Sequence, residues 1–157
     1  MRPGVRLGVD VGKVRIGVAR SDMHGMLATP VATVVRNDDS LSEIIRLAGE
    51  EGAIEIVVGL PLALSGAHTA STNDATGFAD ALSRLSTLPV RLVDERLSTV
   101  SAQRVLKAAG RNVRSSRPII DQVAAVIILQ HALDFERSAG NPPGVLVHPD
   151  EGFHRGE

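Results

Sequence analysis

The stretch VRLGVDVGKVRIGVA, residues 5–19, decides the fold of this chain. It contains two runs rich in β-branched residues, 5–11 and 15–19, separated by Gly12 and Lys13. Two such runs joined by a short turn predict a β-hairpin.

Asp10 lies inside the first of these strands. Because side chains alternate along a strand, Asp10 shares a face with Gly8 and Gly12, while Leu7 and Val9 face the opposite side. A carboxylate between two glycines has room around it for a close approach to the backbone. Asp10 is therefore a candidate functional acid, and the alternative is that it caps the turn.

The rest of the chain continues the pattern outward from the hairpin. We expect further strands at 27–35, with an early break at Pro30, at 54–58 and at 90–93, and helices at 40–52, 69–86, 98–110 and 119–135. Hairpins followed by alternating helices and strands predict an α/β fold. Its mixed five-stranded sheet has an antiparallel arrangement of the first three strands and carries helices on both faces.

Ligands of such sheets bind beyond the carboxyl ends of the parallel strands. The segments after Val9, Val58 and Val93 should therefore lie together. Gly17, inside the second strand, and Gly77, inside the helix predicted at 69–86, are expected to reflect close packing rather than function.

Length and composition indicate one domain, residues 1–137, and a flexible tail at 138–157 that begins around Asn-Pro-Pro-Gly. The chain has no cysteine, which excludes disulfides and thiolate metal sites. It shows no signal-peptide pattern and no apolar run long enough for a membrane span, so we expect a cytoplasmic protein with no membrane contact. Aromatic residues make up 2% of the chain, which disfavours modules that stack bases on rings.

More acids follow the predicted strands. Asp94 and Glu95 come directly after the strand at 90–93, and Asp121 opens the most apolar helix. The alternatives are a surface salt-bridge cluster for the first two and stabilisation of a helix N-terminus for Asp121. If the acids meet, a divalent cation must neutralise them, and their oxygen ligands suit Mg²⁺ or Mn²⁺. Such ions support phosphodiester hydrolysis.

Basic residues gather in one part of a chain whose net charge is −1. From Arg91 to Arg117 there are seven basic residues against the acids Asp94 and Glu95, a local balance of +5. This asymmetry favours a phosphate-facing surface, and a solvated helix face is the alternative. The residues expected to contact nucleic acid there are Arg96, Arg104, Lys107, Arg111, Arg114 and Arg117.

Four blocks resemble the signature motifs of the YqgF/RuvX family: DVGKVRIGVA (10–19), VVGLPLALSG (57–66), DERLST (94–99) and DQVAAVIILQ (121–130). The resemblance spans residues 7–133. It implies a ribonuclease H-like fold similar to that of the junction resolvase RuvC. The implied activity is a nuclease that trims the 5′ end of pre-16S rRNA in ribosome biogenesis.

The resemblance also implies site residues. Asp10, Glu95 and Asp121 are the implied catalytic metal ligands, with Asp94 as the alternative to Glu95. Arg15 and Arg96 are implied substrate contacts, and we expect Lys13 to join them. Many ribonuclease H-like enzymes carry an acid at the end of the fourth strand, where this chain has Gly59-Leu60-Pro61. Its second acid comes from the next strand instead.

Three other readings stay open. The first is a Holliday junction resolvase, which cuts two symmetric strands and so should be a homodimer, whereas an rRNA-trimming enzyme could be a monomer. The second is a non-catalytic RNA-binding assembly factor. The third is an actin-like or sugar-kinase ATPase, which would need two such domains.

Overall fold

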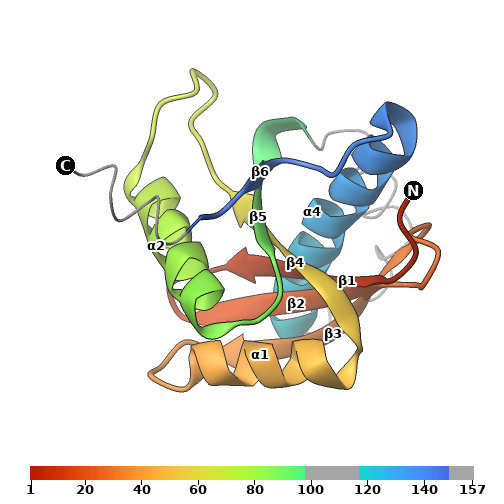
Figure 1. The fold of residues 1–157 in the computed structure, drawn as a ribbon. Helices are drawn as coiled ribbons and strands as arrows, with labels where there is room; N and C mark the ends of the chain where they lie inside the picture. The colour runs from red at the N-terminus through yellow and green to blue at the C-terminus, as the bar shows by residue number, and fades with distance from the viewer. Residues whose placement is uncertain (98–116, 149–157) are drawn as a thin grey trace.

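The computed structural model describes residues 1–97 and 117–148, without the side chains of 97 and 117–120. Within these residues six strands form one sheet in the order β3-β2-β1-β4-β5-β6 (Figure 1). Their bounds are β1 Val5–Val11, β2 Arg15–Ser21, β3 Ala28–Val35, β4 Ala53–Leu60, β5 Val90–Asp94 and β6 Val145–Leu146. The α/β class is confirmed, but the predicted number of five strands is wrong.

The predicted pairing directions are also confirmed. β1 pairs antiparallel with β2, and β2 with β3. β4 lies parallel to β1, and β5 lies parallel to β4. The hairpin turn consists of Lys13 and Val14 rather than Gly12 and Lys13, because the Gly12 N–H donates to the Arg15 carbonyl at 3.1 Å.

Helices cover both faces of the sheet, as predicted (Figure 1). The described helices are α1 Ser40–Glu50, α2 Ala70–Leu85, α4 Arg117–Ala139 and a short 3₁₀ helix, η1, Glu95–Leu97. The helix predicted at 98–110 lies outside the described residues. None of the described helices has the length and apolar character that crossing a membrane requires.

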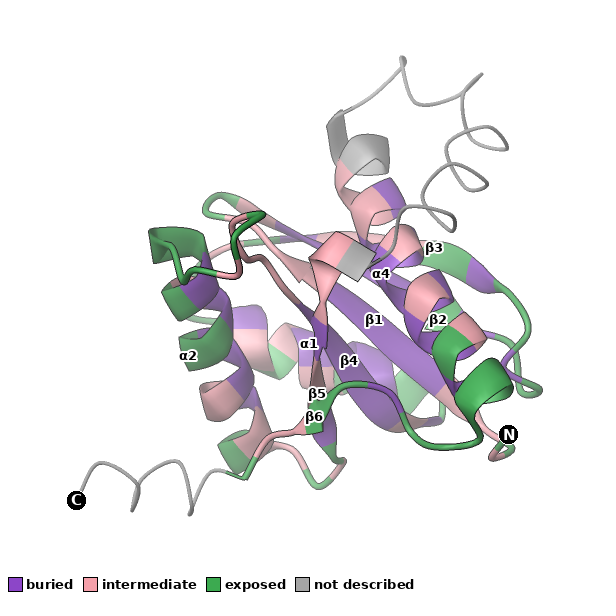
Figure 2. Cartoon of the chain, turned by 90° about the horizontal axis from the view of Figure 1, so that it is seen from above, coloured by how far each residue is buried: buried purple, intermediate pink, exposed green. Residues whose placement is uncertain are grey.

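Because side chains alternate along the strands, the apolar core is divided into two clusters, one on each face of the sheet. Leu7 and Val9 of β1 belong to the cluster under α1 and α2. Val57 and Val93 face the other side, where Leu129 and its neighbours on α4 pack. The central strands β1 and β4 are consequently buried along most of their length (Figure 2).

Pro30 does not break β3, contrary to the prediction. β3 is an edge strand, so the missing N–H of proline costs no pairing within the sheet. The register shifts beside it, between Val18 and Ala19 of β2.

The segment predicted as a tail includes an edge strand. β6 pairs antiparallel with β5, and the Val147 N–H donates to the Val90 carbonyl at 2.8 Å. Gly144 allows this return, since its φ is +65° and a Cβ there would lie 2.1 Å from the Leu92 carbonyl oxygen. The sheet therefore extends past the predicted boundary at 137, and flexibility remains a prediction only for 149–157, outside the described residues.

Candidate active site

The carboxyl ends of the central strands meet at one edge of the sheet. The register pairs Val9 of β1 with Val58 of β4, and Gly59 of β4 with Val93 of β5. The residues that follow these positions therefore share this edge, as the sequence predicted. We call it the carboxyl edge.

Asp10 lies on the α4 side of β1. Its neighbour on that face, Gly8, lies against α4, because a Cβ there would meet the Leu129 Cβ at 2.6 Å. Burial, together with the negative charge of Asp121, raises the pKa of Asp10 to about 6. The predicted proximity of Asp10 and Asp121 is thus present.

Asp121 reaches this position because α4 rests directly on β2. A Cβ on Gly17 would lie 2.0 Å from the Asp121 carbonyl oxygen, so only glycine permits the approach. Gly17 is also the partner of Asp10 in the β1–β2 register. The close packing predicted for Gly17 therefore brings the two acids to the same place.

Glu95 reaches the carboxyl edge from the end of β5. It follows β5 as the first residue of η1, and its carboxylate lies over Gly59 of β4, where a Cβ would be 2.6 Å from Glu95 Oε2. Burial raises the pKa of Glu95 to about 7, and the charges of Asp10 and Asp94 add to this rise. Glu95 thus occupies the space that a side chain at the end of β4 would fill.

Asp94 is held differently from Glu95. The Arg96 guanidinium donates to both Asp94 oxygens, from Nε at 3.1 Å and from Nη2 at 2.6 Å. These bonds hold the pKa of Asp94 below its usual value. Arg96 also donates to the Leu64 carbonyl at 3.2 Å, so it links β5 to the loop before α2.

Two of the predicted substrate contacts, Arg15 and Arg96, form ion pairs within the protein. Arg15 Nε lies 2.7 Å from Asp121 Oδ2, and Arg96 pairs with Asp94. Lys13 is exposed in the hairpin turn, where its charge helps to lower the pKa of Asp74.

Only part of the basic stretch from Arg91 to Arg117 lies within the described residues. Arg104, Lys107, Arg111 and Arg114 lie outside the described residues, as does the side chain of Arg117, which begins α4. Arg91, which contributed to the local positive balance, pairs with the buried carboxylate of Glu55, because its Nε lies 2.6 Å from Glu55 Oε2.

The described residues contain no group of three or more His, Asp or Glu side chains placed to hold a metal ion. The donor set nevertheless suits a hard cation, because Asp10 and Glu95 are close enough for the charge of Asp10 to raise the pKa of Glu95. Mg²⁺ commonly takes one or two carboxylates and completes its shell with water and phosphate oxygens. The chemistry of the residues therefore fits such an ion.

Sequence reasoning missed two supporting contacts. The sequence shows at Gly59 a strand end without an acid. A glycine at a strand end also signals that another group approaches the backbone closely. Arg36 was not considered, yet it donates to the Gly12 carbonyl at 2.8 Å and to both Asp74 oxygens, which ties the hairpin turn to α2.

Comparisons with known proteins show the family of the chain. Residues 4–135 match the family model described as "RuvX: Holliday junction resolvase". A protein of Leifsonia xyli subsp. xyli named "Putative pre-16S rRNA nuclease" is 60% identical over 151 residues, covering 95% of this chain and 97% of the relative. A protein of the same name from Clavibacter michiganensis subsp. michiganensis is 63% identical over 150 residues, covering 94% of this chain and 93% of the relative.

Solved structures share the fold at low sequence identity. RuvC of T. thermophilus in complex with a Holliday junction substrate superposes with a TM-score of 0.61 at 12% identity, covering 89% of this chain and 99% of that one. The structure titled "Thermus thermophilus RuvC structure" gives a TM-score of 0.59 at 15% identity, covering 88% of this chain and 99% of that one. The predicted ribonuclease H-like fold is therefore confirmed.

Proposed function

The chain belongs to the RuvX family, and from this membership we propose that it is a divalent-cation-dependent nuclease that hydrolyses phosphodiester bonds. The substrate that we favour is pre-16S rRNA, because relatives at 60% and 63% identity carry that RNA in their names. The 5′ end as the point of cleavage is what the family resemblance implies. We place the activity in the cytoplasm, where such a precursor would be processed.

The observation that carries the proposal is that Asp10 of β1 lies within electrostatic reach of two acids from distant parts of the chain, Glu95 and Asp121. The charge of Asp10 raises the pKa of Glu95, and the charge of Asp121 raises the pKa of Asp10. Carboxylates held this close are costly without a cation, and perturbed acids of this kind are typical of functional sites.

We propose that Asp10 and Glu95 hold the cation and that Asp121 completes the set. Glu95 is preferred over Asp94, because both Asp94 oxygens already accept hydrogen bonds from Arg96. When bound, Mg²⁺ or Mn²⁺ would neutralise the transferring phosphate and lower the pKa of a water nucleophile. The cluster of acids on the α4 side of the carboxyl edge would orient that water toward phosphorus.

The basic side chains would hold the nucleic acid over these acids. Lys13 lies in the β1–β2 turn and Arg96 in η1, both at the carboxyl edge, where they would bind phosphate oxygens. The proposed contacts also include Arg15, Arg104, Lys107, Arg111, Arg114 and Arg117.

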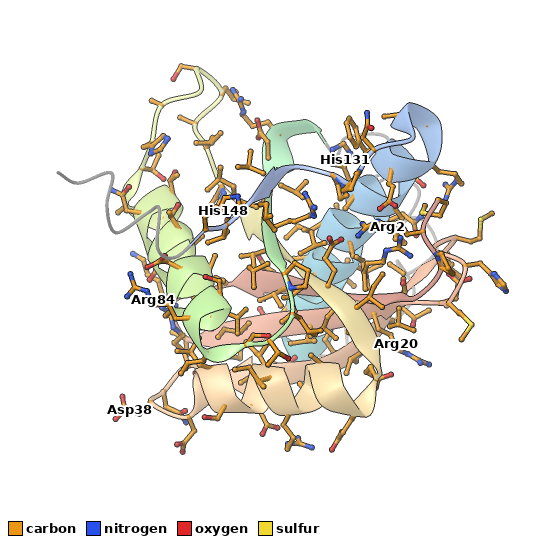
Figure 3. All side chains as sticks on the ribbon, in the orientation of Figure 1. Arg2, Arg20, Asp38, Arg84, His131 and His148 are labelled. Atoms are coloured by element: carbon orange, nitrogen blue, oxygen red, sulfur yellow. The ribbon has the colours of Figure 1, made fainter. Side chains whose placement is uncertain are left out.

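The function is tested by incubating the protein with a 5′-extended 16S precursor RNA in Mg²⁺ or in excess chelator. The wild type should shorten the RNA only with Mg²⁺, and Asp10→Asn should not. Asp38→Asn changes an exposed acid in the loop before α1 and should cleave like the wild type (Figure 3). RNA that binds but stays intact under all conditions would favour a non-catalytic RNA-binding assembly factor.

A junction resolvase is the second candidate, because the family description names that activity and the RuvC fold is shared. This activity predicts paired cuts in a four-way DNA junction and a homodimer in solution. Cleavage of the RNA by a monomer, with the junction left intact, would decide for the first candidate.

A further inference from the structure

Arg15 forms an ion pair with one of the proposed cation ligands. Its Nε lies 2.7 Å from Asp121 Oδ2, and the two side chains are 34% and 22% exposed. The pair therefore lies at the surface of the carboxyl edge, where its partners are accessible to ions and phosphate.

The backbone places a second acid beside this pair. Asp10 is the register partner of Gly17, and the Asp121 backbone lies directly on Gly17. Arg15 is two residues before Gly17 on the same strand, so its side chain leaves the same face. The Arg15 guanidinium thus pairs with Asp121 on the face of the sheet that also carries Asp10.

We propose that Arg15 and the divalent cation compete for Asp121, so that cation binding releases Arg15 toward a phosphate of the substrate. The inference rests on the proposed function and deepens it by giving Arg15 two successive partners. A guanidinium suits both, because its planar donor groups match carboxylate and phosphate oxygens alike. A partly exposed ion pair is weak, so replacing it by the cation costs little free energy.

Competition predicts opposite effects of one substitution on two ligands. Without Arg15, the cation should bind more tightly, because the charge that competes with it for Asp121 is removed. Nucleic acid should bind less tightly, because a phosphate contact is lost. If the ion pair served only to hold Asp121 in position, removing Arg15 would leave Asp121 less ordered. The cation would then bind less tightly.

The test is a titration of Mn²⁺ followed by the electron paramagnetic resonance signal of the free ion, without nucleic acid. Arg15→Gln should lower the Mn²⁺ dissociation constant roughly two- to fivefold, the range expected for a partly exposed ion pair. Arg15→Lys keeps the competing charge and should remain near the wild type. Arg15→Gln should also weaken the binding of a short single-stranded RNA, measured by fluorescence anisotropy in Ca²⁺.

Arg20→Gln is the matched control. Arg20 lies on the same strand, at the other end of the sheet, and pairs with Glu51 at 3.0 Å (Figure 3). It should leave Mn²⁺ affinity unchanged. In an Asp121→Asn background, Arg15→Gln should no longer tighten Mn²⁺ binding, because the shared partner is gone.

Each other outcome contradicts the inference. Unchanged or weaker Mn²⁺ binding by Arg15→Gln overturns the competition but leaves the proposed nuclease intact, provided that the wild type binds Mn²⁺. Equal tightening by Arg20→Gln, or persistence of the effect in Asp121→Asn, would show a general charge effect and overturn it as well. Absence of Mn²⁺ binding by the wild type would overturn the proposed function and the inference together.

Discussion

Gly17 and Asp121 are in direct backbone contact: a Cβ on Gly17 would lie 2.0 Å from the Asp121 carbonyl oxygen. Since Gly17 also pairs with Asp10 across the β1–β2 ladder, this contact fixes how far the two acids lie apart. The packing of α4 on β2 is thus part of the site's geometry and not only of the core.

Gly17→Ala should therefore impair catalysis. The added methyl would push α4 off β2 at Asp121 and displace this acid, and a shift of about 1 Å can lower the rate about a hundredfold. The overpacking should also cost about 1–3 kcal/mol of unfolding free energy. Steady-state cleavage and urea denaturation measure the two effects.

Gly77→Ala is the control for this substitution. Gly77 lies inside α2, and a Cβ there would meet no atom within 4 Å, so the close packing predicted for this glycine is wrong. The variant should be more stable by about 0.4–1 kcal/mol and fully active. Equal activity of Gly17→Ala and Gly77→Ala would contradict the account of α4 packing.

Gly59→Ala should weaken cation binding. Its Cβ would lie 2.6 Å from Glu95 Oε2 and 2.5 Å from Ile128 Cδ1, and both are the far ends of side chains that can move. The fold should persist while Glu95 is displaced from Asp10. Mn²⁺ titration should show a weaker site, and wild-type affinity would mean that Glu95 is not a ligand.

Asp10→Asn should stabilise the cation-free protein at neutral and alkaline pH. Folding raises the pKa of Asp10 from 3.8 to about 6, so the ionised side chain destabilises the fold, and this penalty grows as the pH rises between those values. The gain should be on the order of 1–3 kcal/mol at pH 8 and should vanish below pH 4. Urea denaturation with chelator present measures it, and a loss of stability at pH 8 would be inconsistent with a strained carboxylate.

Glu136→Gln should destabilise the protein at neutral pH. Glu136 is 3% exposed, Arg2 lies 2.8 Å from its Oε1, and Arg6 lies 3.2 Å from its Oε2. Losing one partner of such a buried network should cost on the order of 3 kcal/mol.

The same substitution should change the acid sensitivity. Hydrogen bonds from Arg2, with further help from the charges of Arg2 and Arg6, lower the pKa of Glu136 from 4.5 to about 2. The wild type should therefore lose this stabilisation as the pH falls between those values, whereas Glu136→Gln should show a smaller loss there. Glu50→Gln, which removes an exposed pair with Arg46 on α1, should change little. Parallel acid profiles of wild type and Glu136→Gln would refute the role of this network.

Charge reversal of Arg111 and Arg114 should weaken nucleic-acid binding. Each lost phosphate contact lowers the magnitude of the slope of log affinity against log salt by about 0.7–0.9. The slope of the double variant should therefore be smaller by roughly 1.4–1.8. Fluorescence anisotropy at several salt concentrations measures the slope. An unchanged affinity and slope would remove these residues from the proposed contacts.

Much of the fold and the location of the site could be predicted from local patterns. Alternation along 5–19 placed Asp10 on a face with Gly8, and the apolar pattern placed Asp121 in a long buried helix. The helix begins at Arg117, however, so Asp121 does not open it as predicted. The family motifs then pointed to Glu95. These features are local, because strand periodicity and helix ends depend on neighbouring residues.

What could not be predicted depends on contacts between distant segments. The choice between Asp94 and Glu95 rests on the Arg96 guanidinium and on the empty space at Gly59. The return of β6 rests on Gly144 against the Leu92 carbonyl, so the apolar residues 145–147 were taken for part of a tail. The pairing of Arg91 with buried Glu55 likewise required the register of β4 and β5.

The central claim is that Asp10 and Glu95 bind one divalent cation at the carboxyl edge. Anomalous X-ray scattering from crystals grown with Mn²⁺ tests it most directly. We expect an anomalous peak roughly 2.0–2.3 Å from a carboxylate oxygen of each residue. A peak elsewhere, or no peak in crystals of protein that cleaves RNA in the same buffer, would contradict the claim.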